Sequence, residues 1–127
     1  MRKIESNMME SIRWADRSAA GRIFKLDNTE AELSHTGIFG TFGYDRHILI
    51  KLHGNLIAKI EDVYHGAITL YTQGYHTKTT KSRINAILDH FAPKYGIYQH
   101  NYVWYISKQN ERYMEFYDGV TIFPSDF

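Results

Sequence analysis

The sequence predicts one small α+β domain, in which an antiparallel sheet carries an amphipathic helix. Two patterns predict this class: apolar residues recur at helical spacing over about 80–92, and apolar and polar residues alternate around a tight turn within 48–60. The length is a third observation, because 127 residues, 43% of them hydrophobic, suffice for one buried core. We expect the order α-β-β-β-α-β-β-β-β within a single domain, 1–127, that starts with a helical segment at 1–26.

The first expected element is a helix over about 7–20. Ser6 can cap its start and Gly21 can end it. Its apolar stripe consists of Met8, Ile12, Ala15 and Ala19. Trp14 lies beside this stripe, so it either widens the buried face or belongs to a contact surface, and we expect it in the core.

The next segment, 27–45, is rich in Asn, Thr, Ser and Gly, which predicts turns around short extended pieces with Ile38, Phe39 and Phe42. Its glycines, Gly37, Gly40 and Gly43, lack the spacing and the following Lys of a phosphate loop. Three strands should follow: 48–52 and 56–60 form a hairpin over Gly54-Asn55, and 67–71 is the third.

The helix over about 80–92 is the best-defined element. Thr79 or Thr80 can cap it, and Pro93 ends it. Its apolar stripe consists of Ile84, Ile87, Leu88 and Phe91. Beyond it, 95–98 and 102–106 predict a second hairpin, and the strands 113–116 and 120–123 flank an Asp118-Gly119 turn. We expect this helix on one face of the sheet and the N-terminal helix on the other.

Charge is unevenly distributed along the chain, although the net charge is only +1. Lys and Arg number nine against nine acids in 1–62, five against one in 63–108, and one against four in 109–127. The cations of the basic segment gather at the start of the second helix, where unpaired backbone N–H groups attract anions. The expected anion- or phosphate-binding residues are Thr77, Lys78, Thr79, Thr80, Lys81 and Arg83. The alternative is structural: the threonines cap the helix, Arg83 pairs with a carboxylate of the acidic tail, and Asn85 braces a turn.

Several function classes find little support in the sequence. Without cysteine there is no disulfide and no thiolate metal site, and we expect no cofactor. No run approaches the roughly 18 apolar residues of a membrane span, and the start has no signal peptide, so we expect a location in the cytoplasm. The seven histidines form no metal motif, although His53 and His65 with Asp62 could converge as the metal site of a phosphoesterase or nuclease.

Two segments carry a resemblance to a family. Leu52-His53-Gly54-Asn55-Leu56-Ile57-Ala58 is the first, and Gly74-Tyr75-His76-Thr77-Lys78-Thr79-Thr80-Lys81-Ser82-Arg83-Ile84-Asn85 is the second, with Trp104 and Tyr117-Asp118-Gly119 later in the chain. Over about 28–123 the chain resembles a family of small uncharacterised proteins of tailed bacteriophages. The resemblance implies a phage origin and a family-like core at 28–123, and it implies no chemistry.

Two binding functions remain open. The first is a non-enzymatic effector that binds a host protein or nucleoprotein complex, for host takeover or anti-defence, since ten tyrosines and two tryptophans offer interface anchors. The second is direct binding of DNA or RNA, with cations that include Lys94 on phosphates and aromatic rings on bases. The aromatic candidates for a partner or for bases are Tyr75, Tyr98, Tyr102 and Trp104. We favour the effector because the chain is nearly neutral, and a homodimer is possible.

Overall fold

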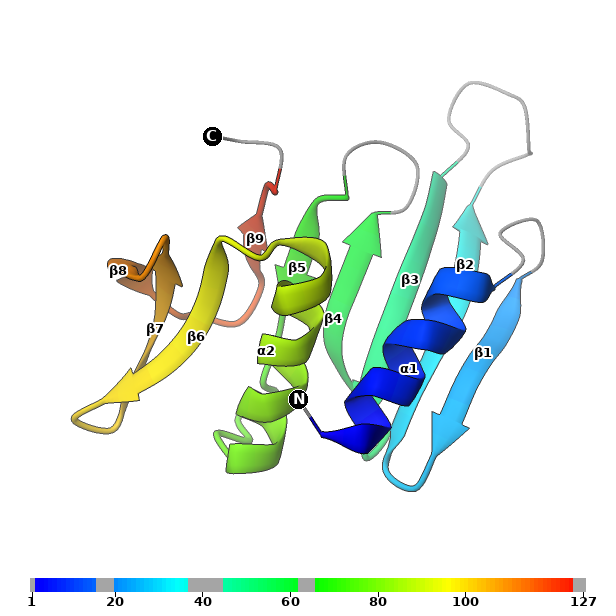
Figure 1. Ribbon diagram of the computed structural model, residues 1–127, viewed down its shortest axis with the longest axis horizontal. Helices are drawn as coiled ribbons and strands as arrows, with labels where there is room; N and C mark the ends of the chain where they lie inside the picture. Colours follow the sequence, from blue (N-terminus) through cyan, green and yellow to red (C-terminus); the bar gives the residue numbers. More distant parts are fainter. Residues whose placement is uncertain (1, 16–19, 37–44, 62–65, 125–127) are drawn as a thin grey trace.

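Two helices and nine strands form the described part of the computed structural model, which covers residues 2–15, 20–36, 45–61 and 66–124 (Figure 1). The elements are α1 (Lys3–Trp14), β1 (Gly21–Leu26), β2 (Thr29–Thr36), β3 (Asp45–Leu52), β4 (Asn55–Glu61), β5 (Ile68–Leu70), α2 (Lys78–Phe91), β6 (Tyr95–His100), β7 (Val103–Lys108), β8 (Glu111–Glu115) and β9 (Val120–Ile122). The α+β class, the N-terminal helix and the expected strands are confirmed, and β1 and β2 precede those strands as additions.

The strands form two antiparallel sheets. One has six strands in the order β1-β2-β3-β4-β5-β9, and the other has the order β6-β7-β8. The segments that flank Asp118-Gly119 therefore do not pair with each other, because β8 pairs with β7 and β9 pairs with β5. The last strand, β9, is thus an edge strand of the large sheet, while β6, β7 and β8 form a sheet of their own.

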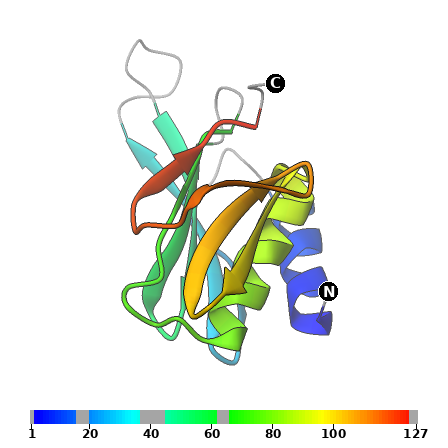
Figure 2. The same cartoon turned by 90° about the vertical axis from the view of Figure 1, so that its left-hand side faces the viewer.

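Both helices lie on the same face of the six-stranded sheet (Figures 1 and 2). The expectation that α1 covers the opposite face is wrong, since α1 packs beside α2 and against β1 and β2. The reason is that only one sheet face is apolar. Its buried side chains form two rows across the strands, Ala31-Ile50-Ala58-Leu70-Val120 and Leu33-Ile48-Ile60-Ile68-Ile122. The other face carries charged pairs such as Lys51 with Glu32 at 3.0 Å.

The helix α1 begins earlier than the sequence pattern indicates. Its N-cap is Arg2, whose N–H donates to Glu5 Oε1 at 3.0 Å, so Ser6 lies inside the first turn. It ends at Trp14 because Ala15 is extended, well before Gly21. Ala19 and the glycines of 37–44 lie outside the described residues.

Trp14 is 76% exposed, so the expectation that it packs in the core is wrong. The buried stripe of α1 consists of Met8, Met9 and Ile12 together with the carboxylate of Glu5. Although tryptophan is largely apolar, the Trp14 side chain stays exposed because the sheet packs against the other face of α1.

The helix α2 follows the predicted pattern closely. Ile84, Ile87 and Leu88 are fully buried, and Phe91 packs partly buried against the core. The hairpin between β3 and β4 also forms, and its two-residue turn has His53 at φ +53° and Gly54 at φ +78°. The predicted hairpin is confirmed, but its two-residue turn is His53-Gly54, one residue earlier than the expected Gly54-Asn55, and positive φ at both residues is typical of such a turn.

Candidate functional site

The start of α2 is built by a threonine cap. Thr77 is extended at the N-cap, and its Oγ1 accepts a hydrogen bond from the Thr80 N–H at 3.1 Å and contacts Thr80 Oγ1 at 3.0 Å. The cap is thus Thr77 rather than Thr79 or Thr80. The N–H groups of Lys78 and Thr79 have no intrahelical acceptor, and none is found among the described residues. The positive end of the helix dipole therefore presents two free donors.

A cavity of about 510 Å³ lies beside this helix start. We call it the α2 pocket, and its lining residues are Leu52, His53, Asn55, Ile57, Thr72, Tyr75, Thr77, Thr79 and Thr80. Apolar side chains from the β3–β4 hairpin share the lining with hydroxyl, amide and imidazole groups. This mixture is typical of a site that binds a small polar group.

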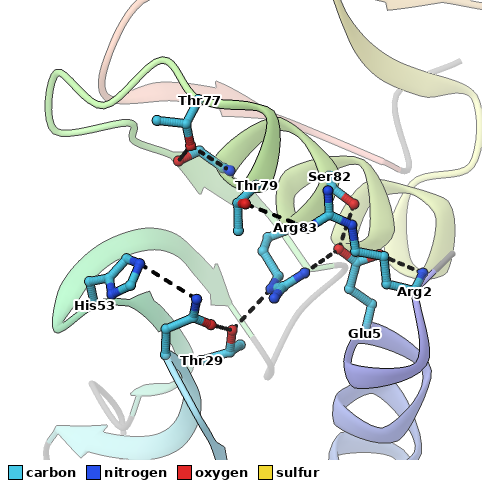
Figure 3. Close-up of polar contacts among 10 residues, drawn as sticks. Arg2, Glu5, Thr29, His53, Thr77, Thr79, Ser82 and Arg83 are labelled. Atoms are coloured by element: carbon cyan, nitrogen blue, oxygen red, sulfur yellow. Dashed lines mark hydrogen bonds and ion pairs between the residues drawn. The ribbon is translucent and has the colours of Figure 1, made fainter.

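Arg83 does not line this pocket, although it is among the anion-binding residues expected from the sequence. The residue is 4% exposed, and its Nη1 donates to Glu5 Oε2 at 2.7 Å (Figure 3). Its Nε donates to Thr29 Oγ1 at 2.9 Å. Arg83 thus pairs with a carboxylate, as the structural alternative proposed, but the carboxylate comes from α1 and not from the acidic tail. An anion at the helix start cannot reach this buried guanidinium.

Glu5 is the centre of a polar network between the two helices. Its Oε2 also accepts from Ser82 Oγ at 2.6 Å, and it is 1% exposed. Burial by itself would raise the pKa of Glu5, but the hydrogen bonds from Ser82, the Arg2 N–H and Arg83, with the charge of Arg83, outweigh burial and lower it. Glu5 is therefore ionised and fastens α1 to α2.

This network reaches the α2 pocket from two sides (Figure 3). On one side, Arg2 Nη1 donates to Thr79 Oγ1 at 3.5 Å. On the other side, Thr29 Oγ1 donates to Asn28 Oδ1 at 2.8 Å, and the Asn28 amide lies 3.5 Å from His53 Nε2. The N-terminal helix thus supports both walls of the pocket.

The loop before α2 is anchored to the end of the chain. Asp118 accepts hydrogen bonds from the N–H and Oγ1 of Thr72, both at 2.9 Å, and from the Gln73 N–H at 2.8 Å. Burial would raise the pKa of Asp118, but these bonds and the nearby His76 lower it. The anchored loop holds Tyr75, which lines the pocket and is 58% exposed.

The aromatic candidates have different environments. Trp104 is 3% exposed and stacks on His76 with ring centroids 4.7 Å apart, so its ring is not free for a base or a partner. Tyr102 is 91% exposed at the β6–β7 turn. Tyr98 lies on the small sheet, where its ring stacks with that of Tyr105 at 5.5 Å.

One family model matches almost the whole chain. It is described as Kyanoviridae Gp96 protein and matches residues 1–123. The chain belongs to this family. No curated protein and no solved structure matches the chain.

Membership in the Kyanoviridae Gp96 family confirms the predicted phage resemblance and extends it through α1, beyond the expected 28–123. The two segments on which that resemblance rests meet in the structure. Leu52, His53, Asn55 and Ile57 come from the first, and Tyr75, Thr77, Thr79 and Thr80 come from the second, and all eight line the α2 pocket. The segments are thus two walls of one cavity.

The predicted anion-binding residues fall into three groups. Thr77, Thr79 and Thr80 line the α2 pocket, whereas Lys78 and Lys81 lie on the helix start outside its lining, exposed and partly buried respectively. Arg83 is in the core. Three threonine hydroxyls and two lysines therefore remain available to an anion at the helix start, and Arg83 does not.

Asn85, the last residue of the second segment, has a structural role. Its amide donates to the Ile97 carbonyl at 3.0 Å, and its Oδ1 accepts from the Ile97 N–H at 2.7 Å. It therefore pairs with the free edge of β6 as a neighbouring strand would, rather than bracing a turn.

The described part of the chain contains no group of three metal-ligating side chains. His65 and Asp62, which the metal hypothesis requires beside His53, lie outside the described residues. None of the described helices is long and apolar enough to cross a membrane.

Proposed function

We propose that this phage protein is a non-enzymatic accessory protein that binds a host macromolecule through the α2 pocket, which takes an anionic group of the partner. The proposed partner is a host protein or nucleoprotein complex in the bacterial cytoplasm, bound for host takeover or anti-defence. The observation that carries the proposal is that a cavity lined by three threonines of the α2 start lies beside a helix end whose first backbone N–H groups are free.

The chemistry of the pocket suits a phosphate or a carboxylate. Thr77 and Thr79 bring hydroxyls, and the free N–H groups of Lys78 and Thr79 lie at the positive end of the helix dipole, which favours a bound anion. Arg2, which contacts Thr79, adds a cation at the rim in place of the buried Arg83. The apolar walls lower the local dielectric and strengthen each of these hydrogen bonds.

A protein partner is favoured over nucleic acid. Direct nucleic-acid binding needs several cations on phosphates and exposed rings on bases. Because Arg83 and Trp104 are buried, the candidate surface has one cation and one aromatic ring fewer than the sequence suggested. The net charge of the whole chain is only +1.

The test is a pull-down from host lysate, with and without nuclease treatment, followed by a salt titration of the purified pair. The variants are Lys81→Ala and Thr79→Val, because the first removes charge and the second removes a hydroxyl at nearly constant volume. Arg13→Ala is the matched control, since it removes an exposed cation in the last turn of α1, at the end of that helix away from Arg2 and the pocket.

The proposal expects a protein that stays bound after nuclease treatment, with slower association for Lys81→Ala and weaker binding for Thr79→Val. Retention that depends on nucleic acid, with a salt slope flatter by about one charge in Lys81→Ala, would instead establish the nucleic-acid reading. If both variants equal wild type against every partner, the helix start is only solvated surface and the proposal fails.

A further inference from the structure

The sheet β6–β8 has an outer face that no described helix covers. Its inner face is buried through Ile97, Trp104 and Ile106. Because side chains alternate along a strand, Tyr98 and Tyr105, which are partners across β6 and β7, project from the outer face. Figure 2 shows this hairpin toward the viewer, with both helices behind it.

A guanidinium is held in a fixed position on this face. Arg112 of β8 lies 4.1 Å from the centroid of the Tyr105 ring, and its Nε donates to the Tyr98 hydroxyl at 3.0 Å. The two tyrosine rings are themselves stacked, with an interplanar angle of 24°. The rings and the hydroxyl together orient a side chain that would otherwise be free to rotate.

The outer nitrogens of Arg112 are available to a ligand. Among the described residues its only hydrogen-bond acceptor is the Tyr98 hydroxyl, and no described carboxylate pairs with it. A planar guanidinium binds a carboxylate through two parallel hydrogen bonds. Since the contacts with Tyr98 and Tyr105 already fix the group, little rotational freedom remains to be lost on binding.

The tip of the same hairpin shows a second, independent irregularity. The two-residue turn Asn101-Tyr102 has φ +50° and +67°, the geometry in which Asn-Gly is strongly preferred. A bulky side chain is disfavoured in this left-handed region. Tyr102 nevertheless occupies it with its ring 91% exposed, so packing does not account for the residue.

We propose that this outer face is a docking surface for an acidic protein segment. An Asp or Glu carboxylate of the partner binds the free fork of Arg112, and Tyr98, Tyr105 and Tyr102 contact the flanking side chains. Tyrosine and arginine are the residue types that dominate binding energy at protein interfaces.

A protein segment fits this surface better than a nucleic acid does. The other Lys or Arg of the small sheet, Lys108, lies 5.4 Å from the ring centroids of Tyr95 and Tyr113, on the face away from Arg112. One free guanidinium matches one carboxylate, whereas a phosphate backbone is bound by several cations. This surface is separate from the α2 pocket and does not depend on it.

The test uses the full chain and a short peptide of alternating Glu and Ala, with a matched peptide of Gln and Ala. Titrations are followed through the NMR signals of the Arg112 Nε–H group and of the tyrosine rings. The Glu peptide should shift these signals and the Gln peptide should not. Arg112→Lys keeps the charge but loses the fork, so it should weaken binding by about tenfold.

Two further variants separate binding from folding. Arg22→Lys, on the far edge of the large sheet, should bind the peptide as wild type does. Tyr102→Gly should raise the melting temperature while weakening peptide binding, a combination that a structural role for Tyr102 does not produce. The proposal is overturned if neither peptide or both peptides shift the signals, if Arg112→Lys binds like wild type, or if an oligonucleotide shifts them at lower concentration than the Glu peptide.

Discussion

Removal of the Glu5 carboxylate should destabilise the protein more than any other change at the helix interface. Glu5 and Arg83 are 1% and 4% exposed and lie 2.7 Å apart, so Glu5→Ala leaves a buried guanidinium without its counter-charge. Breaking a buried pair by removal of one partner costs about 3–5 kcal/mol. Small domains are stable by about 5–15 kcal/mol, so the variant should lose a large part of its stability.

Urea unfolding measures this loss directly. The midpoint should fall while the slope of the free energy against urea stays unchanged, because the unfolding transition exposes the same surface. Glu5→Gln is the matched control: it retains an acceptor for Ser82 and Arg83, and should cost less. Replacement of both partners, Glu5→Met with Arg83→Met, should restore most of the stability, since no unpaired charge remains. A cost below about 1 kcal/mol for Glu5→Ala would refute the reasoning, because it is the cost of an exposed ion pair.

Four other changes have defined outcomes. Leu88→Ala removes a fully buried side chain and should cost about 2–5 kcal/mol in urea unfolding, whereas a surface-like cost under about 0.5 kcal/mol would contradict the packing of α2. Thr77→Ala removes the cap oxygen and should cost about 1 kcal/mol, with Thr77→Ser close to wild type. Tyr102→Gly relieves a left-handed backbone and should stabilise by about 1 kcal/mol, so a loss of stability would contradict the strain. Acid should destabilise the fold, because folding lowers the pKa values of Glu5 and Asp118 below their ordinary values of 4.5 and 3.8. In the acid range the unfolded chain therefore binds more protons than the folded chain does. The stability that these two carboxylates contribute is present above their ordinary pKa values and is lost as the pH falls through their lowered pKa values. Midpoints of urea unfolding across the acid range check this, and Glu5→Gln should show a weaker dependence.

The parts of the fold that local patterns encode could be predicted from the sequence. The helix α2 has a strong apolar stripe and a proline stop, and the β3–β4 hairpin has alternation around a glycine at positive φ. The strand β2 was harder to recognise because two of its three inward residues, Thr29 and Ala31, are polar or small, and only Leu33 is large and apolar. A pattern of this kind also occurs in loops. The segment forms a strand because it pairs with β3, and a local sequence pattern does not indicate a pairing between residues that lie apart in the sequence.

The candidate site could be predicted only in part for the same reason. The threonines and lysines at the start of α2 form a local pattern, and they lie where that pattern indicated. The environment of Arg83 is set by Glu5, which is 78 positions earlier in the chain. The other wall of the α2 pocket comes from His53 and its turn, which no helix pattern indicates. Long-range contacts thus decided which cations face solvent.

Some residues oppose the local folding preferences of their helix or turn. Those that tertiary packing does not explain are candidates for functional residues. Cations near the N-terminal end of α2 oppose the helix dipole. For Arg83 the buried carboxylate of Glu5 supplies the reason, but Lys78 and Lys81 have no such partner among the described residues. Tyr102 likewise has an unfavourable left-handed backbone conformation, and its exposed side chain makes no buried contact that would offset it. The residues that folding leaves unexplained therefore lie at the start of α2 and at the tip of the β6–β7 hairpin, the two places where we propose that partners bind.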